Sequence, residues 1–337
     1  MTLLVTGGTG FVMSNVVRRW LLQEQRERAV IVDANTPDDL AKRFFSPVAS
    51  RLDHIKADVL SNELWASLAG RSDIGYVVHG ATVTSINRHV HADGHGKPGL
   101  AGAQRSIAVN IDGTVNVLAW AQSLPALQCL VNVSSGSVYA DSDPAARPLP
   151  EEGYVAPEGI YAITKYTGEL FTAFSAREFD LPAVSVRLSG VFGPMDRQTS
   201  ARDVTCAPKA IALRALAGEV VRVRALEAAG DFIQAGDVAA AIIGLLEAGQ
   251  RRHAVYNVAA GETATIDDLL TCTREKFPSL RYVLAGAGER DVDYDPAQRT
   301  GRWGAYDISR IRQDTGWSPR PLRDSLHEYL DWLTAMR

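Results

Sequence analysis

The stretch between residues 3 and 22 constrains the fold most strongly. An apolar run at residues 3–5 precedes glycines at positions 7, 8 and 10, and a helical pattern of apolar residues follows over 11–22. Glycine lets the backbone turn sharply and come close to a pyrophosphate, and the amino end of a helix favours the negative charge of that group. This order of strand, glycine turn and helix is typical of the first unit of a dinucleotide-binding α/β domain.

An aspartate ends the second expected strand. Residues 29–32 are apolar, and Asp33 follows them directly. A carboxylate at this point can accept hydrogen bonds from both hydroxyls of an adenosine ribose and would repel a 2′-phosphate, so Asp33 favours NAD over NADP. The interpretation stays open in two ways, because aspartate is also a common turn residue and Arg43 is near enough in the sequence to offset its charge.

Tyr161 and Lys165 are four residues apart near the start of another expected helix. Side chains with this spacing lie on one face of a helix, with Cβ atoms about 6 Å apart. A free tyrosine has a pKa of about 10, and general base catalysis near neutral pH requires a value about 2 to 3 lower. The charge of Lys165 would provide part of that change. The pair therefore predicts a catalytic base, although the same spacing is also common on helix surfaces.

A hydroxyl-rich loop lies upstream of this pair. The apolar residues 130–133 predict a strand, and Ser134, Ser135, Gly136 and Ser137 follow it. A serine at the end of such a strand can hydrogen-bond a substrate oxygen. Serine and glycine also gather in ordinary loops, so the prediction rests on the combination of this loop with the tyrosine and the lysine.

Together these features resemble the extended short-chain dehydrogenase/reductase superfamily, specifically its NAD-dependent epimerase/dehydratase family. The resemblance covers nearly the whole chain. Further matching segments occur in the family's order at residues 6–12, 78–81, 110–114, 193–194, 231–233, 307–309 and 316–317.

The resemblance implies an α/β fold with two parts. A doubly wound parallel sheet, the Rossmann fold, would bind NAD, and a smaller C-terminal α/β domain would bind substrate. The NAD-binding Rossmann domain would occupy residues 1–188, with 232–258 returning to it. The substrate-binding domain would lie mainly in 189–337, with residues 307–333 among those that finish it.

The resemblance also assigns roles to individual residues. It implies that Asn110 orders a proton-relay water and completes a catalytic set with Ser135, Tyr161 and Lys165, although an asparagine at a helix start is common in any case. Asp58 would meet the adenine. The predicted cofactor-binding residues are Gly7, Gly10, Phe11, Val12, Asp33, Asp58, Val59, Gly80, Ala81 and Lys165. The predicted substrate-binding residues are Thr82, Ser135, Ser137, Gly190, Arg222 and Arg299.

Three positions depart from the family pattern. Met13 stands where a third glycine is usual, so we expect looser packing of the first helix on its strand. Gly190 and Gly230 replace an asparagine and an arginine that contact the nucleotide part of sugar-nucleotide substrates. Arg222 and Arg224 could substitute for these lost contacts, or they could be exposed strand residues.

The lost contacts favour a small substrate. We therefore expect an NAD-dependent oxidoreductase that transfers hydride from a secondary alcohol of a small sugar, sugar acid, polyol or hydroxy acid, with Tyr161 as general base. One of Arg290, Arg299 and Arg302, in a loop-like stretch, could hold a substrate carboxylate. The alternative is an NAD-dependent nucleotide-sugar epimerase that retains its cofactor.

Two other functions fit the sequence less well. The resemblance implies that a dehydratase would carry its acid and base carboxylates next to the catalytic serine, where this chain has Gly136 and Ser137. A catalytically inactive NAD-sensing protein would have lost Tyr161 or Lys165, and this chain retains both.

The composition predicts a small-molecule partner and neither nucleic acid nor a membrane. Lys and Arg total 35, Asp and Glu total 39, and the net charge of −4 comes without blocks of like charge. The cysteines Cys129, Cys206 and Cys272 are odd in number and widely spaced, which favours reduced thiols in a cytoplasmic protein. We expect no signal peptide and no transmembrane segment, because the first strand begins near Met1 and no apolar run reaches ~18 residues.

The segment from residue 82 to 109 is longer than the family pattern and rich in histidine and glycine. Its histidines, His89, His91 and His95, match no compact zinc spacing, so we predict no metal. We expect a loop over the active site that sets specificity. The helical segments 106–123 and 160–178 are the pair through which family members usually dimerise, so the resemblance implies a homodimer.

Overall fold

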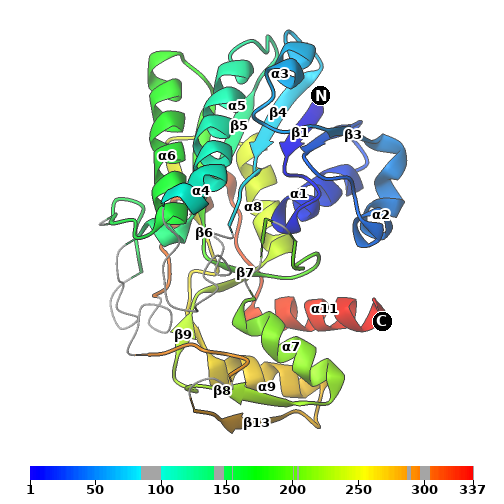
Figure 1. The fold of residues 1–337 in the computed structure, drawn as a ribbon, viewed down its shortest axis with the longest axis vertical. Coiled ribbons are helices and arrows are strands. Elements are labelled where there is room, and N and C mark those ends of the chain that lie inside the picture. The colour runs from blue at the N-terminus through cyan, green and yellow to red at the C-terminus, as the bar shows by residue number, and fades with distance from the viewer. Residues whose placement is uncertain are drawn as a thin grey trace.

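The computed structural model describes residues 1–84, 100–139, 148–153, 155–199, 201–202, 205–286, 290–296 and 304–336, without the side chains of 100–102. These residues form an α/β domain whose central sheet lies between two layers of helices, with a smaller domain packed beyond the carboxyl ends of the strands (Figure 1). The predicted fold class is therefore confirmed.

The central sheet has seven strands in the order β11-β6-β5-β4-β1-β2-β3. Every neighbouring pair is parallel. The order reverses at β1, so the carboxyl ends of β1 and β4 flank the crevice in which doubly wound sheets bind ligands. The strands are β1 (Thr2–Thr6), β2 (Ala29–Asp33), β3 (Leu52–Lys56), β4 (Ile74–His79), β5 (Cys129–Ser135), β6 (Ala183–Leu188) and β11 (Val255–Val258).

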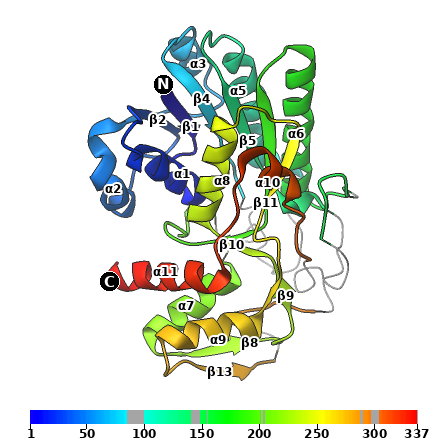
Figure 2. The same cartoon turned by 180° about the vertical axis from the view of Figure 1, so that it is seen from behind.

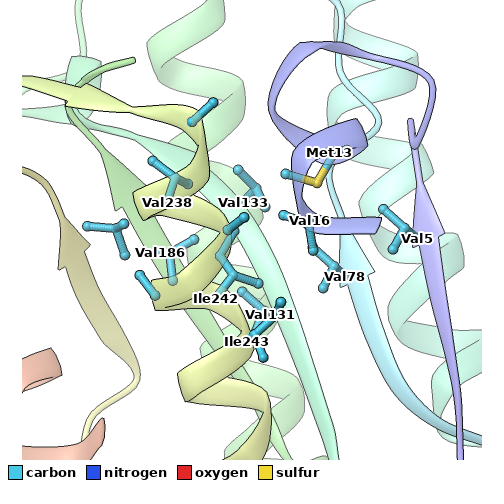
Figure 3. Packing of buried hydrophobic residues seen from close by; sticks show 14 of the residues in the cluster. Val5, Met13, Val16, Val78, Val131, Val133, Val186, Val238, Ile242 and Ile243 are labelled. Carbon is cyan, nitrogen blue, oxygen red and sulfur yellow. The ribbon is translucent and has the colours of Figure 1, made fainter. Parts of the chain in front are cut away.

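Alternation along the buried strands supplies one core on each face of the sheet. In β1, Leu3 and Val5 join a core with α1 (Phe11–Leu22) and α8 (Ala235–Glu247), as Figure 3 shows for Val5. Leu4 instead joins the core of the opposite face. That face is covered by α3 (Asn62–Leu68), α5 (Gly113–Ala121) and, beside α5, α6 (Ile160–Glu178) (Figure 2). The core of α1 and α8 also takes in buried residues of α2 (Asp39–Phe45) and of the 3₁₀ turns η1 (Ser46–Arg51) and η3 (Gly136–Val138).

The smaller domain has a separate hydrophobic core. The parallel pair β8 (Val220–Val223) and β13 (Arg281–Leu284) forms its outer side in Figure 1. Its helices are α7 (Ala207–Ala217), α9 (Ile266–Lys276) and α11 (Leu322–Ala335). Two short strand pairs complete the description: β7 (Gly190–Phe192) with β10 (Phe232–Gln234), and β9 (Ala229–Gly230) with β12 (Ala264–Thr265).

Two segments differ from the sequence prediction. Asn110 does not open a helix, because α4 (Leu100–Ile107) runs through a π-helical turn, η2 (Ala108–Asp112), directly into α5. Residues 307–333 do not all finish the smaller domain: Ile308 and Ile311, at the start of α10 (Ser309–Thr315), are buried in the core that also holds α8. Helix α11 does pack into the smaller core. The proposed domain boundaries themselves stay a prediction.

Candidate active site

Ser135 and Tyr161 meet at the carboxyl end of β5. Ser135 is the last residue of that strand and Tyr161 is in the first turn of α6, close enough for the serine hydroxyl to influence the pKa of the phenol. Burial raises the pKa of Tyr161 above its usual value, while the hydrogen bond with Ser135 and the charge of Arg202 lower it. The net direction is opposite to the predicted lowering, because burial outweighs both of these interactions.

Lys165 lies one turn further along α6, beneath the tyrosine. Its Nζ donates a hydrogen bond to the carbonyl oxygen of Val133 over 2.8 Å and lies 6.0 Å from the centre of the Tyr161 ring. The side chain is buried, and burial lowers the pKa of Lys165 to about 8 even though the charge of Glu169 raises it. The spacing of four residues thus brings the ammonium and the phenol to one face of the helix, as predicted.

Asn110 connects the end of β4 with α6. Its Nδ2 donates to Oγ1 of Thr164 over 3.0 Å and to the carbonyl oxygen of Val83 over 3.2 Å. Its Oδ1 accepts hydrogen bonds from Thr82 Oγ1 at 3.0 Å and from the Val83 amide at 2.9 Å. The amide is 3 % exposed and lies in the π-helical turn, a feature often found at functional sites. These bonds fix Thr82, a predicted substrate contact, close to α6.

The glycine turn lies against the end of β4. Gly7 has a φ of +70°, and a Cβ atom on it would lie 2.8 Å from the Cα of Ala81. Both the conformation and the close approach therefore require glycine. Oγ1 of Thr6 accepts hydrogen bonds from the amides of Gly80 and Ala81, each 3.2 Å long. The predicted cofactor residues Gly7, Gly80 and Ala81 are thus brought together.

Met13, which stands where the family usually has a third glycine, packs against a glycine at the end of β4. Met13 is buried, and its sulfur lies where a Cβ atom on Gly80 would be. Figure 3 shows the side chain beside Val16 of the same helix, near the end of β4. The Met13 side chain fits at this position because Gly80 carries no side chain that would overlap it.

Asp33 holds the glycine turn as well as ending β2. Its Oδ2 accepts hydrogen bonds from Thr9 Oγ1 at 2.6 Å and from the Thr9 amide at 3.1 Å, and its Oδ1 accepts one from the Asn35 amide at 2.9 Å. Arg43 is exposed on α2, and within the described residues it forms no ion pair with Asp33. Arg43 therefore does not offset the charge of Asp33 in this way, and the contact of Asp33 with a ribose stays a prediction.

The family model for the NAD dependent epimerase/dehydratase family matches residues 3–259, which contain the glycine turn, Ser135, Tyr161 and Lys165. This chain belongs to that family.

Relatives from this family match along the whole chain. A UDP-glucose 4-epimerase of Mycolicibacterium smegmatis is 28% identical over 95% of this chain and 94% of its own length. A GDP-6-deoxy-D-mannose reductase of Pseudomonas aeruginosa is 26% identical over 99% and 98%. Among solved structures, a UDP-glucuronic acid 4-epimerase of Bacillus cereus in complex with UDP-glucuronic acid and NAD covers 100% of both chains, with 22% identity and a TM-score of 0.79, and shares the fold.

The residues of this epimerase/dehydratase family member fit its family's cofactor, NAD. Gly10 precedes α1 without a side-chain cap, so the first-turn amides at Phe11 and Val12 have no side-chain partner. Those amides could hold a pyrophosphate, and Asp33 could hold a ribose. When bound, NAD supplies a hydride acceptor and donor.

Asp58 and Val59, the other predicted cofactor residues, have protein partners. Asp58 forms an ion pair with Arg105 at 2.5 Å, and although burial raises the pKa of Asp58, hydrogen bonds from Arg105 and from the Leu60 amide hold it below the usual value. Val59 is buried. A Cβ atom on Gly113 would lie only 2.7 Å from Cγ2 of Val59, so the two residues pack closely. The pairing of Asp58 with α4 was not predicted.

The predicted substrate residues fall into two groups. Ser137 lies in the turn after Ser135 and donates its amide hydrogen to Ser135 Oγ over 3.2 Å. Gly190 begins β7, where a Cβ atom would lie 2.9 Å from the carbonyl oxygen of Asp231. Arg222 is exposed on β8 in the smaller domain, and no contact joins it to the catalytic residues in the part of the chain that the structure describes. Arg299 lies outside the described residues.

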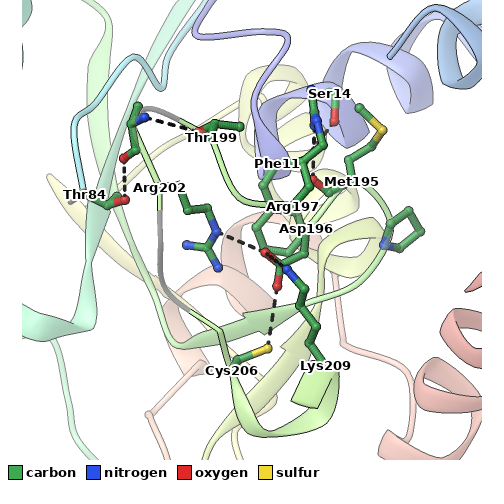
Figure 4. Close-up of polar contacts among 12 residues, drawn as sticks. Phe11, Ser14, Thr84, Met195, Asp196, Arg197, Thr199, Arg202, Cys206 and Lys209 are labelled. Carbon is green, nitrogen blue, oxygen red and sulfur yellow. Dashed lines mark hydrogen bonds and ion pairs between the residues drawn. The ribbon is translucent and has the colours of Figure 1, made fainter. Parts of the chain in front are cut away.

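The cations that follow β7 were not predicted from the sequence. Arg202 lies over the ring of Phe11, with its Cζ 4.9 Å from the ring centre, and its Nε pairs with Asp196 Oδ1 at 3.1 Å. Lys209 reaches the same oxygen at 3.4 Å (Figure 4). Arg197 donates to the carbonyl oxygen of Thr9 at 3.1 Å. The sequence offers only cations spaced around one aspartate, which gives no sign that they reach the glycine turn.

Among the described residues, no group of three His, Cys, Asp or Glu side chains could hold a metal ion. None of the described helices combines the length and the apolar character needed to cross a membrane. The histidines between residues 89 and 95 lie outside the described residues.

Proposed function

We propose that this protein is a nucleotide-sugar epimerase that retains NAD during the reaction. The observation that carries the proposal is that Ser135, at the carboxyl end of β5, and Tyr161, in the first turn of α6, come together with the buried ammonium of Lys165 6.0 Å from the centre of the tyrosine ring. Tyr161 would take the proton from a secondary alcohol of the sugar and later return a proton to the oxygen. Ser135 would donate a hydrogen bond to the oxygen as negative charge develops.

The relatives support a nucleotide sugar as the substrate. One of the two relatives named above is a UDP-glucose 4-epimerase and the other is a GDP-6-deoxy-D-mannose reductase, so both names contain a nucleotide sugar. Both relatives match at least 95% of this chain. A match over the full length includes the smaller domain, which is expected to bind the substrate. It therefore supports a shared substrate class better than a match limited to the cofactor-binding domain would. This support outweighs the sequence-based expectation of a small sugar, sugar acid, polyol or hydroxy acid as the substrate.

A dehydrogenase of a small sugar is the second candidate, because two nucleotide contacts have no room in this structure. A Cβ atom on Gly190 would lie 2.9 Å from a backbone oxygen of Asp231, and one on Gly230 would lie 2.9 Å from the Phe232 ring. Restoring the expected asparagine and arginine would therefore require movement of the Asp231 backbone at the first position and of the Phe232 ring at the second.

A dehydratase has less support at the serine turn. A side chain at position 136 would overlap the hydroxyl of Tyr306. The carboxylate expected there in a dehydratase therefore has no space beside Ser135.

The test uses purified protein supplied with NAD. Its substrates are UDP-glucose, UDP-glucuronate and GDP-mannose in one series, and free sugars and sugar acids in a second series. Chromatography of the sugar products and absorbance of free NADH are followed in the same samples. Epimerised nucleotide sugar without free NADH supports the proposal. Substrate-dependent NADH release from free sugars or sugar acids, without epimerisation, supports the dehydrogenase instead.

The matched control is Tyr161→Phe, which should bind NAD with unchanged affinity and lose turnover. NAD binding with no turnover of any nucleotide sugar or free sugar by the wild-type protein would contradict both enzyme proposals. That outcome would favour the NAD-sensing alternative.

A further inference from the structure

The segment that follows β7 carries a cluster of charges to the glycine turn. Its members are Asp196, Arg202 and Lys209, and Asp196 accepts from both cations at the distances given above. The side chain of Asp196 is 0% exposed, that of Lys209 is 9% exposed and that of Arg202 is 23% exposed. The cluster is thus largely removed from water.

The charges of this cluster do not balance. Two cations face one carboxylate, because in the described part of the chain Asp196 is the sole carboxylate paired with either cation. The neighbouring thiol of Cys206 lies 3.8 Å from Asp196 Oδ2, and burial raises its pKa to about 12, so it adds no negative charge. A largely buried excess positive charge is costly unless an anion compensates it.

Arg202 is the member with binding capacity left. Its Nε pairs with Asp196, and Figure 4 shows its two terminal nitrogens on the side away from that carboxylate. A guanidinium presents its donors as a planar fork that matches the oxygens of a phosphate or a carboxylate. Arg202 can therefore hold Asp196 and a second anion together.

The surroundings of Arg202 indicate where that anion would lie. The guanidinium stacks over Phe11, the first residue of α1, and it is near enough to Tyr161 for its charge to lower the pKa of the phenol. The Ala201 carbonyl, next in the chain, accepts hydrogen bonds from the amide and hydroxyl of Thr84 at 2.9 and 2.8 Å. These bonds hold the segment across the ends of β1 and β4.

We propose that Arg202 binds an oxyanion group, a phosphate or a carboxylate, between Phe11 and Tyr161. Two sources can supply it: the pyrophosphate of NAD, or the phosphate or carboxylate of the substrate. The substrate source rests on the proposed function, and the cofactor source does not.

The test compares wild-type protein with Arg202→Gln, Arg202→Lys and Arg281→Gln. The last of these removes an exposed arginine of β13 and serves as the matched control. Dissociation constants are measured for NADH by fluorescence, and for UDP-glucose and UDP-glucuronate on NAD-loaded protein by calorimetry. Loss of a charge-assisted hydrogen bond should weaken binding about 10- to 100-fold in Arg202→Gln.

The pattern of losses identifies the source. Weaker NADH binding identifies the cofactor pyrophosphate. Equal losses for both nucleotide sugars, with NADH unchanged, identify the substrate phosphate, and a loss confined to UDP-glucuronate identifies a sugar carboxylate. Arg202→Lys keeps the charge beside Asp196 and so protects folding. Its binding of the affected ligand should weaken several-fold, because lysine lacks the planar fork of donors.

The proposal is overturned if both Arg202 variants bind all three ligands as the wild-type protein and Arg281→Gln do. Failure of the proposed function would look different, because the wild-type protein itself would then bind neither nucleotide sugar. In that case the test rests on NADH binding alone. A dissociation constant for NADH that is the same in the Arg202 variants and the wild type would then reject the oxyanion site.

Discussion

The sulfur of Met13 occupies the space in which a Cβ atom of Gly80 would lie. The two residues come from α1 and from the turn after β4, the elements that flank the cofactor crevice. A residue larger than glycine at one position is thus tolerated because the other position has no side chain. The pair acts as one packing unit beneath the expected dinucleotide.

This relationship predicts strong coupling between the two positions. Gly80→Ala should cost about 1 to 3 kcal/mol of unfolding free energy through overpacking, and Met13→Ala about 2 to 5 kcal/mol through the cavity it leaves. The double variant should cost clearly less than both together, because the new methyl group enters that cavity. Urea denaturation of the four proteins measures the coupling, and additive costs would show that the contact has no energetic weight.

Asp33 should set the choice between NAD and NADP. Asp33→Ala should weaken NADH binding about tenfold by removing the ribose acceptor, and it should improve NADPH binding relative to NADH by removing a repelling charge. Thr9→Val is the matched control, since it removes the 2.6 Å hydrogen bond to Asp33 but keeps the carboxylate. Fluorescence titrations with both nucleotides give the constants, and a gain in NADPH preference in Thr9→Val as well would assign the effect to the turn.

Much of this site was predictable from local patterns. Glycines directly after an apolar strand indicate a close backbone approach, and Gly7 has that role beside Ala81. The spacing of four between Tyr161 and Lys165 needs only helix geometry, and the structure has both on α6. Such predictions succeed because the interacting groups belong to one element or to adjacent strand ends.

Contacts between distant segments were not predictable in this way. Asp58 pairs with Arg105, and Met13 packs at Gly80, only because the strand order brings those segments together. Arg202 reaches Phe11 because the chain after β7 crosses back over the strand ends. Spacing gives no information on such a path, so these residues could be identified only after the fold was known.

Ser135 should control both the rate and its pH dependence. Ser135→Ala should lose ~100-fold or more in turnover, because one oxyanion donor is typically worth ~3 to 4 kcal/mol. The hydrogen bond from Ser135 also lowers the pKa of Tyr161. Its removal should raise that pKa, so the rise of activity with pH should move to higher pH.

Steady-state rates across the alkaline range check both expectations, with NADH binding as the control for folding. Tyr161→Phe should lose more activity than Ser135→Ala and show no such pH dependence. A near-normal rate in Ser135→Ala, or a pH profile unchanged from the wild type, would remove Ser135 from the proposed catalytic set.

Lys165 should make the stability of the protein rise with alkaline pH. Burial lowers its pKa from the ordinary 10.5 to about 8 in the folded chain, so between these values the unfolded chain binds more protons than the native one. The free energy of unfolding therefore rises with pH in this window, and the cost of the buried charge, of order 3 kcal/mol, is fully present below about pH 8.

Lys165→Met lacks this titration, so the stability of the wild type relative to the variant should increase from about pH 8 upward. Urea denaturation of both proteins along this range measures the difference, with the exposed Lys42→Met as the control for loss of one charge. A difference that stays flat through the window would mean that Lys165 is not titrating in the buried position beneath Tyr161.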